Sequence, residues 1–153
     1  MIARKLKTFL DERRVKYYTL VHSPAYTAAE VAAAAHISGR VLAKTVMVIV
    51  DGAMAMAVLP SNHRVLLDDL CELTGTEDVR LAREEEFKDL FPDCEAGAMP
   101  PFGNLYDMSV YVSTDLAEEA EIAFNAGTHT EIISMGWHDF ERLVNPRVAS
   151  FTT

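Results

Sequence analysis

Two long apolar runs on either side of Asp51-Gly52 constrain the fold of this chain more than any other feature. The stretch is VLAKTVMVIVDGAMAMAVLP, residues 41–60, and Asp-Gly between apolar runs is a strong signal for a two-residue hairpin turn. Such a turn fixes the register, placing opposite each other Val50 and Ala53, Val48 and Ala55, Val46 and Ala57, and Lys44 and Leu59. Both faces of this hairpin are apolar, so we expect it to be central and covered on both sides.

The rest of the chain alternates between helical and extended patterns. Thr27 and Glu30 form a capping box that opens an alanine-rich helix, which we expect to reach about His36 and to end by Gly39. The predicted helices cover 2–14, 27–36, 65–75, 83–91 and 137–144. The predicted strands, besides the hairpin, cover 15–21, 78–82, 105–113, 121–127 and 130–135.

This interspersion of helices and strands, with at least one antiparallel hairpin, predicts a mixed α/β fold rather than a doubly wound parallel sheet. A chain of 153 residues has the usual size of one domain and buries enough surface to form a core. No linker or internal repeat divides it. We therefore expect residues 1–153 to form a single domain.

Charge and composition narrow the partners and the compartment. The net charge of −9 argues against general binding of nucleic acid, DNA included, but residues 1–16 carry six of the 14 basic residues. That basic segment is either a contact for a phosphate backbone or a solvated helix face. No apolar run is long enough for a membrane helix, and no secretory signal is recognisable. The two cysteines lack metal or redox spacing, and we expect a cytoplasmic protein.

Lys44 is the one charged residue in the first strand of the hairpin, and it lies on the face whose partners include small alanines. An ammonium group cannot be fully buried there without a partner, because its desolvation is costly. The side chain either extends past the strand end into solvent or lines a pocket that the small residues leave open. The residues alone leave both interpretations open.

Two further segments are candidate sites. The stretch CEAGAMPPFGNLY, residues 94–106, is either an ordinary turn or a rigid loop whose glycines allow a ligand to approach closely. His129 follows Gly127 between two strand-like runs and is either an exposed turn residue or part of a site. No metal-ligand spacing, nucleophile motif, P-loop or dinucleotide motif accompanies these residues. We therefore expect no metal ion and no cofactor.

Three features occur in one order: a lysine that opens an apolar hairpin, a Gly-x-x-x-Pro loop followed by Phe-Gly, and a glycine-containing strand pair from Gly127 to Met135. This order resembles the YbaK/ProX family, the free-standing relatives of the editing domain in bacterial prolyl-tRNA synthetases. The resemblance covers nearly the whole chain and implies a barrel-like mixed β-sheet with flanking helices. It also implies an aminoacyl-tRNA deacylase, which hydrolyses the ester between a wrong amino acid and the terminal adenosine of a tRNA.

The resemblance further implies the roles of individual residues. Lys44 would be the essential catalytic lysine, contacting the 3′ end of the tRNA and placing positive charge beside the developing oxyanion. The residues implied to shape the aminoacyl pocket are Gly97, Pro101, Phe102, Gly103 and His129. Water would attack with help from the ribose hydroxyl, without a metal or a side-chain nucleophile. The implied partner is aminoacyl-tRNA, with an aminoacyl-tRNA synthetase as a second candidate.

Two other functions fit the same sequence. One is a non-catalytic module of the same fold that binds RNA or a protein partner. The retained Lys44 and the intact loop count against it, because a bare scaffold needs neither. The other is a hydrolase of small aminoacyl esters unconnected to tRNA, which composition does not exclude. A panel of mischarged tRNAs would separate the three.

Overall fold

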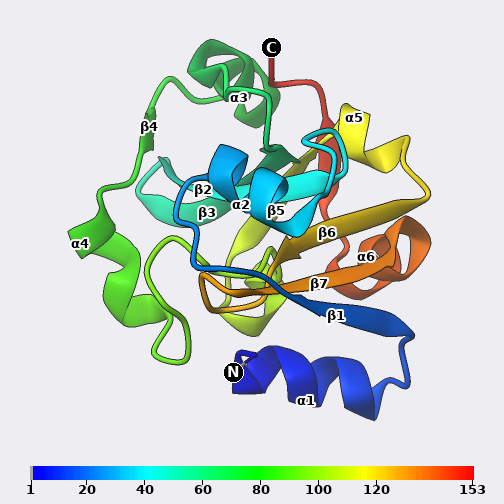
Figure 1. The fold of residues 1–153 in the computed structure, drawn as a ribbon. Coiled ribbons are helices and arrows are strands. Elements are labelled where there is room, and N and C mark those ends of the chain that lie inside the picture. The colour runs from blue at the N-terminus through cyan, green and yellow to red at the C-terminus, as the bar shows by residue number, and fades with distance from the viewer. Residues whose placement is uncertain (1) are drawn as a thin grey trace.

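Residues 2–153, which the computed structural model describes, fold into one eight-stranded mixed sheet with helices packed around it (Figure 1). This confirms the predicted mixed α/β class. The helices are α1 (Arg4–Glu12), α2 (Ala28–Ala35), α3 (Leu67–Thr74), α4 (Glu84–Phe87), α5 (Thr114–Ala117) and α6 (Trp137–Val144). Short 3-10 helices cover Lys88–Leu90 and Gly103–Leu105. The strands are β1 (Tyr17–Val21), β2 (Leu42–Val50), β3 (Ala53–Pro60), β4 (Val79–Leu81), β5 (Ser109–Ser113), β6 (Glu121–Asn125), β7 (Glu131–Gly136) and β8 (Arg147–Ala149).

The β2 and β3 strands form the hairpin that the sequence predicts, with Asp51 and Gly52 in the turn. Both turn residues have positive φ, 49° and 81°, which a two-residue hairpin turn requires and which favours an Asp-Gly pair there. The register is the predicted one, including Lys44 opposite Leu59. A slip of one residue would exchange the two faces, so this register decides which side of the sheet Lys44 occupies.

Both faces of the hairpin contact buried residues, as expected for a central position. On one face, Met47 and Met56 join the larger core cluster. Its aromatic members include Phe102, Phe124 and Phe140. On the opposite face, Ala57 belongs to a second cluster with Leu70 of α3 and with Phe151 near the C-terminus. The hairpin therefore separates two apolar layers and is held rigidly between them.

The sheet has the order β1-β7-β6-β2-β3-β5-β8, and β4 pairs with β2 off this path. The β2–β6, β3–β5 and β5–β8 pairs are parallel, and the others are antiparallel. Parallel pairing places β6 beside the beginning of β2, although some 80 positions of sequence separate them. Figure 1 shows α1 beneath β1 at one end of the molecule and α3 at the opposite end.

One edge of β2 is only partly covered. On that edge β6 pairs with Leu42 and Ala43, while β4 pairs with β2 from Val48 onward. A hydrogen bond of 2.9 Å from the Ala82 N–H to the Met47 carbonyl extends the β4 side. Between Ala43 and Met47, no strand of residues 2–153 pairs with this edge. Backbone groups point to the same edge at every second residue, so those of Thr45 face the gap.

Of two predicted helix ends, one agrees with the structure and one does not. α2 ends at Ala35, close to the predicted end at His36, because His36 adopts the left-handed conformation (φ 57°) and donates its N–H to the carbonyls of Ala32 and Ala33. The predicted helix over 83–91 is α4, which ends at Phe87 and continues as a 3-10 turn. No residue of α4 is buried, so packing does not stabilise a longer helix.

Strand boundaries differ at two further places. β5 begins at Ser109 rather than at residue 105, because Gly103–Leu105 form a 3-10 turn and Asp107 has a positive φ of 56°. α5 and β8 are absent from the sequence prediction. β8 has three residues and is defined by its parallel pairing with β5, a contact that a local pattern does not reveal.

Candidate functional site

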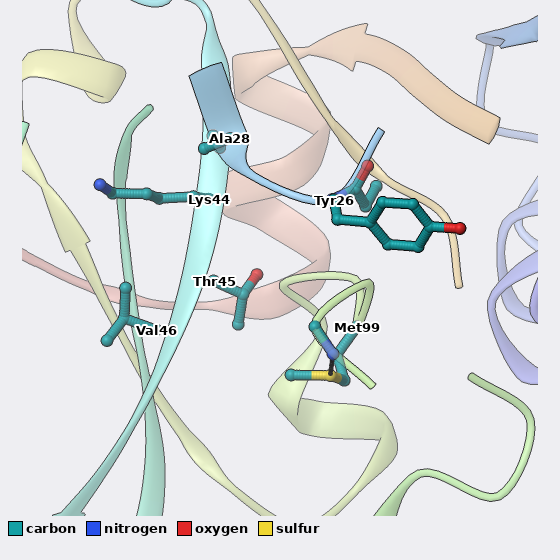
Figure 2. Close-up of a pocket in the computed structure, with 9 residues that line it drawn as sticks. Tyr26, Ala28, Lys44, Thr45, Val46 and Met99 are labelled. Carbon is teal, nitrogen blue, oxygen red and sulfur yellow. Dashed lines mark hydrogen bonds between the residues drawn. The ribbon is translucent and has the colours of Figure 1, made fainter. Parts of the chain in front are cut away.

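A small cavity of about 150 Å³ lies at the open edge of β2 (Figure 2). It is lined by Tyr26, Ala28, Ala43, Lys44, Thr45, Val46, Gly97, Met99 and Asn125. These residues come from the loop before α2, from the first residue of α2, from β2, from the Gly/Pro loop and from the end of β6. A wider hollow of about 480 Å³ beside α3 is lined by Asp69, Glu72, Leu73 and Ser150, and its two carboxylates would repel an anionic substrate. We therefore place the candidate site at β2.

Alternation along β2 distributes the lining side chains to both sides of the strand. Figure 2 shows Lys44 and Val46 pointing to one side, whereas Thr45 points to the other side together with Tyr26 and Met99. This follows from the period of two in an extended strand. The gap in the sheet at Thr45 leaves the strand edge open between the two sides. A ligand can therefore contact the cation on one side and the small cavity wall on the other.

Lys44 is half-buried, and no carboxylate of the described chain forms an ion pair with it. Burial lowers the pKa of its ammonium group, and the positive charge of Arg64 lowers that pKa further. A partly desolvated cation beside a second cation attracts an anionic ligand such as a phosphate. Of the two interpretations of Lys44, the structure favours a side chain that contributes to a pocket wall.

The Gly/Pro loop enters the site through Gly97 and Met99. Gly97 has a φ of 85°, the left-handed region that glycine adopts with little strain. Its N–H lies 3.2 Å from the sulfur of Met99, a weak acceptor that an oxygen of a ligand could replace. Backbone bonds from Glu95 to Gly127 (2.8 Å) and from Gly127 to Ala98 (2.9 Å) join the loop to the β6–β7 turn.

His129 forms hydrogen bonds with this loop and is not among the residues that line the cavity. Its Nε2 lies 2.9 Å from the carbonyl oxygen of Ala96, and its N–H lies 3.3 Å from a carboxylate oxygen of Glu95. Its ring is 4.6 Å from the ring of Tyr26, which does line the cavity and is 68% exposed. The side chain of His129 therefore joins the loop to the mouth of the cavity.

The other three predicted loop residues are buried and do not line the cavity. Phe102 is fully buried, with ring centroids 5.5 Å from Phe124 and 5.4 Å from Phe140. Gly103 is packed so closely that an added Cβ would lie 2.6 Å from a methyl group of Val110. Pro101 lies next to Phe102 in the same buried segment. Their positions indicate that these residues anchor the loop to the core.

The structure adds residues that the sequence analysis did not single out as site residues, among them Tyr26, Thr45, Met99 and Asn125. Thr45 follows Lys44 directly and Met99 lies inside the predicted loop, so both were within reach of the sequence. Tyr26 and Asn125 carry no local signal. They join the site only because β6 pairs with β2 and the segment before α2 crosses the same edge.

Other chemistry-bearing groups lie away from the cavity. Burial raises the pKa of the Cys94 thiol to about 12, so this cysteine stays protonated and is a poor nucleophile. Within residues 2–153, no three or more His, Cys, Asp or Glu side chains cluster in a way that could hold a metal ion. None of the described helices is both long and apolar enough to span a membrane.

The basic N-terminal segment is partly occupied by internal contacts. Lys7 forms an ion pair with Asp11 at 2.6 Å, and Lys5 lies 4.9 Å from the centre of the Tyr106 ring. The guanidinium of Arg13 lies 3.8 Å from the centre of the Phe9 ring. Fewer charges of α1 are therefore available to a ligand than the sequence suggests.

Comparison with known proteins identifies the family and supports the fold. The family model of the aminoacyl-tRNA editing domain matches residues 22–143. Hypothetical protein APE2540 is similar with 23% identity and a TM-score of 0.86, over 98% of this chain and 100% of that one. A candidate trans-editing enzyme for prolyl-tRNA synthetase is similar with 23% identity and a TM-score of 0.81, over 99% and 96% of the two chains.

A third structure, a candidate signal transduction protein from Marinobacter aquaeolei VT8, is 16% identical with a TM-score of 0.77. It covers 97% of this chain, which corresponds to only 30% of that larger chain. No curated protein sequence matches. At these identities the structures establish the shared fold, and the family model establishes the family. The chain belongs to the aminoacyl-tRNA editing domain family.

Proposed function

We propose that this protein is a trans-editing deacylase that hydrolyses the ester of a mischarged tRNA with water. Membership in the editing family supports a deacylase in general terms. The observation that carries the proposal is the position of Lys44, a half-buried cation without an acidic partner in the described chain, beside a small cavity at an open strand edge. A cation in this setting is suited to the ribose-phosphate end of a tRNA.

In this proposal the two sides of β2 have different tasks. Lys44, with Arg64 nearby, holds the 3′ end of the tRNA through its negative charge. The aminoacyl group occupies the cavity between Thr45, Met99 and Asn125. The N–H of Gly97 exchanges its contact with the Met99 sulfur for one with the developing oxyanion, which is the better acceptor.

The proposed reaction is hydrolysis of the aminoacyl ester of the tRNA by one water molecule. The oxygen of a water molecule bonds to the ester carbonyl carbon, and the carbonyl oxygen takes up negative charge. The bond from that carbon to the ribose oxygen then breaks, and the ribose oxygen leaves with a proton. The neighbouring ribose hydroxyl assists the water, so that the free amino acid and the uncharged tRNA form without a side-chain nucleophile. Positive charge at Lys44 and a hydrogen bond from Gly97 would stabilise the intermediate.

Pro101, Phe102, Gly103 and His129 hold the loop in this account rather than contact the substrate. Phe102 and Gly103 fix its base in the core, and His129 fixes the carbonyl just before Gly97. The tRNA itself is the proposed partner. An aminoacyl-tRNA synthetase is a second candidate partner, since the net charge of −9 disfavours tight tRNA binding by this chain alone.

A panel of mischarged tRNAs incubated with the purified protein tests this proposal. Release of the amino acid from one or more pairs, at a rate well above spontaneous hydrolysis, is the expected result. Binding of tRNA without release would instead favour a non-catalytic module. Hydrolysis of small aminoacyl esters without any activity on tRNA would favour a hydrolase of small esters that is unconnected to tRNA. Each of these two results would overturn the proposal.

A further inference from the structure

Asn125 is the last residue of β6, and its side chain lines the cavity. Its Oδ1 is buried and has no hydrogen-bond partner within residues 2–153. Its backbone is fixed by antiparallel pairing opposite Ile132 and by the parallel β2–β6 pair that ends one residue earlier, at Phe124. The amide is therefore held at the cavity wall by two neighbouring strands.

A buried acceptor without a donor destabilises the folded protein, and most such groups in native proteins have a partner. Tyr26 and Lys44 line the same cavity and carry side-chain donors, but neither forms a hydrogen bond with Asn125 Oδ1 in the described chain. Thr45 has a hydroxyl, but no hydrogen bond joins it to Asn125 in the described chain. The missing donor is thus expected from a ligand.

The cavity sets the size of that ligand. Its volume of about 150 Å³ is close to that of engineered protein cavities that hold one benzene ring. The wall is mostly polar, with Lys44, Thr45 and Asn125 among its residues, and alanine and methionine add apolar atoms. A small aminoacyl group fits within these dimensions.

We propose that Asn125 is a substrate-binding residue whose amide oxygen accepts a hydrogen bond from the aminoacyl group bound in this cavity. This inference rests on the proposed function. The class of substrate is a small aminoacyl ester that presents an N–H or O–H donor to the wall. The donor is either the α-ammonium group, present in every amino acid, or a hydroxyl of the amino-acid side chain. The two sources make different predictions.

The test compares wild type with Asn125→Ala on tRNA charged with alanine and on tRNA charged with serine. Loss of one hydrogen bond should lower kcat/KM by about tenfold. An equal loss on both substrates identifies the α-ammonium as the donor, and a loss confined to seryl-tRNA identifies the hydroxyl. Unchanged activity on both substrates overturns the inference. Asn104→Ala, an exposed asparagine outside the cavity, is the matched control and should keep full activity.

The melting temperature of each variant and the binding of amide-linked analogues distinguish a failure of this inference from a failure of the proposed function. Asn125→Ala removes an unpaired buried acceptor, so its melting temperature should not fall in proportion to its activity. Asn125→Asp keeps an acceptor oxygen and should retain more activity than Asn125→Ala. If wild type hydrolyses neither tRNA, binding of the amide-linked analogues, 3′-alanylamido- and 3′-serylamido-adenosine, decides. Tighter binding by wild type than by Asn125→Ala then supports the inference although the function fails, and equal or no binding overturns it.

Discussion

The Nε2 atom of His129 donates a hydrogen bond of 2.9 Å to the carbonyl oxygen of Ala96, one residue before Gly97. A carbonyl oxygen can only accept, so Nε2 carries a proton in this contact. Nδ1 is buried and has no partner in residues 2–153. The imidazole therefore holds the loop backbone at one point.

We expect His129→Ala to lower turnover several-fold, because the carbonyl before Gly97 loses its donor and the loop gains freedom. His129→Gln places an amide N–H near the position of Nε2 and should restore part of the activity. Deacylation rates of the three proteins, at matched folded fractions, provide the measurement. If the two variants lose the same activity, the hydrogen bond from His129 to Ala96 does not account for the effect of His129 on turnover.

Gly97→Ala should reduce turnover by at least about tenfold, a barrier change near 1.4 kcal/mol. Its φ of 85° disfavours any residue with a Cβ, and the added carbon would lie 3.6 Å from the His129 ring. That distance is an ordinary van der Waals contact, so the strain at the positive φ, not a clash with His129, should shift the loop. Small and large amino acids should then be affected alike.

Gly52→Ala is the matched control for this variant. Gly52 has a similar φ of 81°, and no atom lies within 4 Å of an added Cβ. It should lose similar stability while keeping wild-type turnover per folded molecule. Equal turnover losses in both variants would assign the effect to general strain. A size-dependent loss in Gly97→Ala would mean that the loop narrows the cavity.

Gly103→Ala should mainly destabilise the protein. An added Cβ would lie 2.6 Å from a methyl of Val110 and 2.7 Å from the Met108 carbonyl oxygen, so neighbouring core atoms would have to move. Such overpacking lowers the free energy of unfolding by about 1–3 kcal/mol. Thermal unfolding should report this loss, and turnover per folded molecule should stay near that of wild type. A stable but inactive variant would show that Gly103 acts on the substrate.

The lowered pKa of Lys44 predicts a pH dependence. Burial is the larger cause and the charge of Arg64 the smaller one, so turnover should decline at a lower pH than expected for an exposed lysine. Arg64→Ala removes the like charge and should move the decline to higher pH. Arg142→Ala, an exposed arginine paired with Asp139, should leave the pH–rate profile unchanged. If the decline of turnover at alkaline pH stays at the same pH in Arg64→Ala, the decline does not report the ionisation of Lys44.

The same shift has a consequence for stability. The pKa of Lys44 is lower in the folded protein than in the unfolded chain, so between the two values the unfolded chain binds more protons. The free energy of unfolding should therefore rise with pH across that window. Lys44→Met should flatten this rise, and urea unfolding at several alkaline pH values would measure it. A wild-type slope in Lys44→Met would assign the rise to other groups.

The sequence predicts the parts of this structure that local chemistry specifies. Asp51-Gly52 determines the turn, the turn determines the register, and the register places Lys44 at the open edge. Gly97 is likewise found from its motif. Asn125 and β8 escape prediction, because each depends on parallel pairing between segments far apart in the chain. Pairing at long range has no local pattern to detect.

The Gly/Pro loop shows a second limit. A motif identifies Phe102 and Gly103 as members of the loop, but it does not separate residues that face a ligand from residues that anchor the loop. That distinction comes from packing, since Phe102 lies among core aromatic rings and Gly103 against Val110. The sequence therefore predicts a candidate site, and tertiary contacts decide which of the predicted residues line the cavity.

Single-turnover deacylation by wild type and Lys44→Ala, on the mischarged tRNA that wild type hydrolyses fastest, tests the central claim most directly. Thermal unfolding of the same preparations ensures that only folded protein is compared. The account predicts a loss on the order of a hundredfold in Lys44→Ala, the scale for removing one group that stabilises an oxyanion, with no loss of stability. A folded Lys44→Ala protein with the wild-type rate would contradict it.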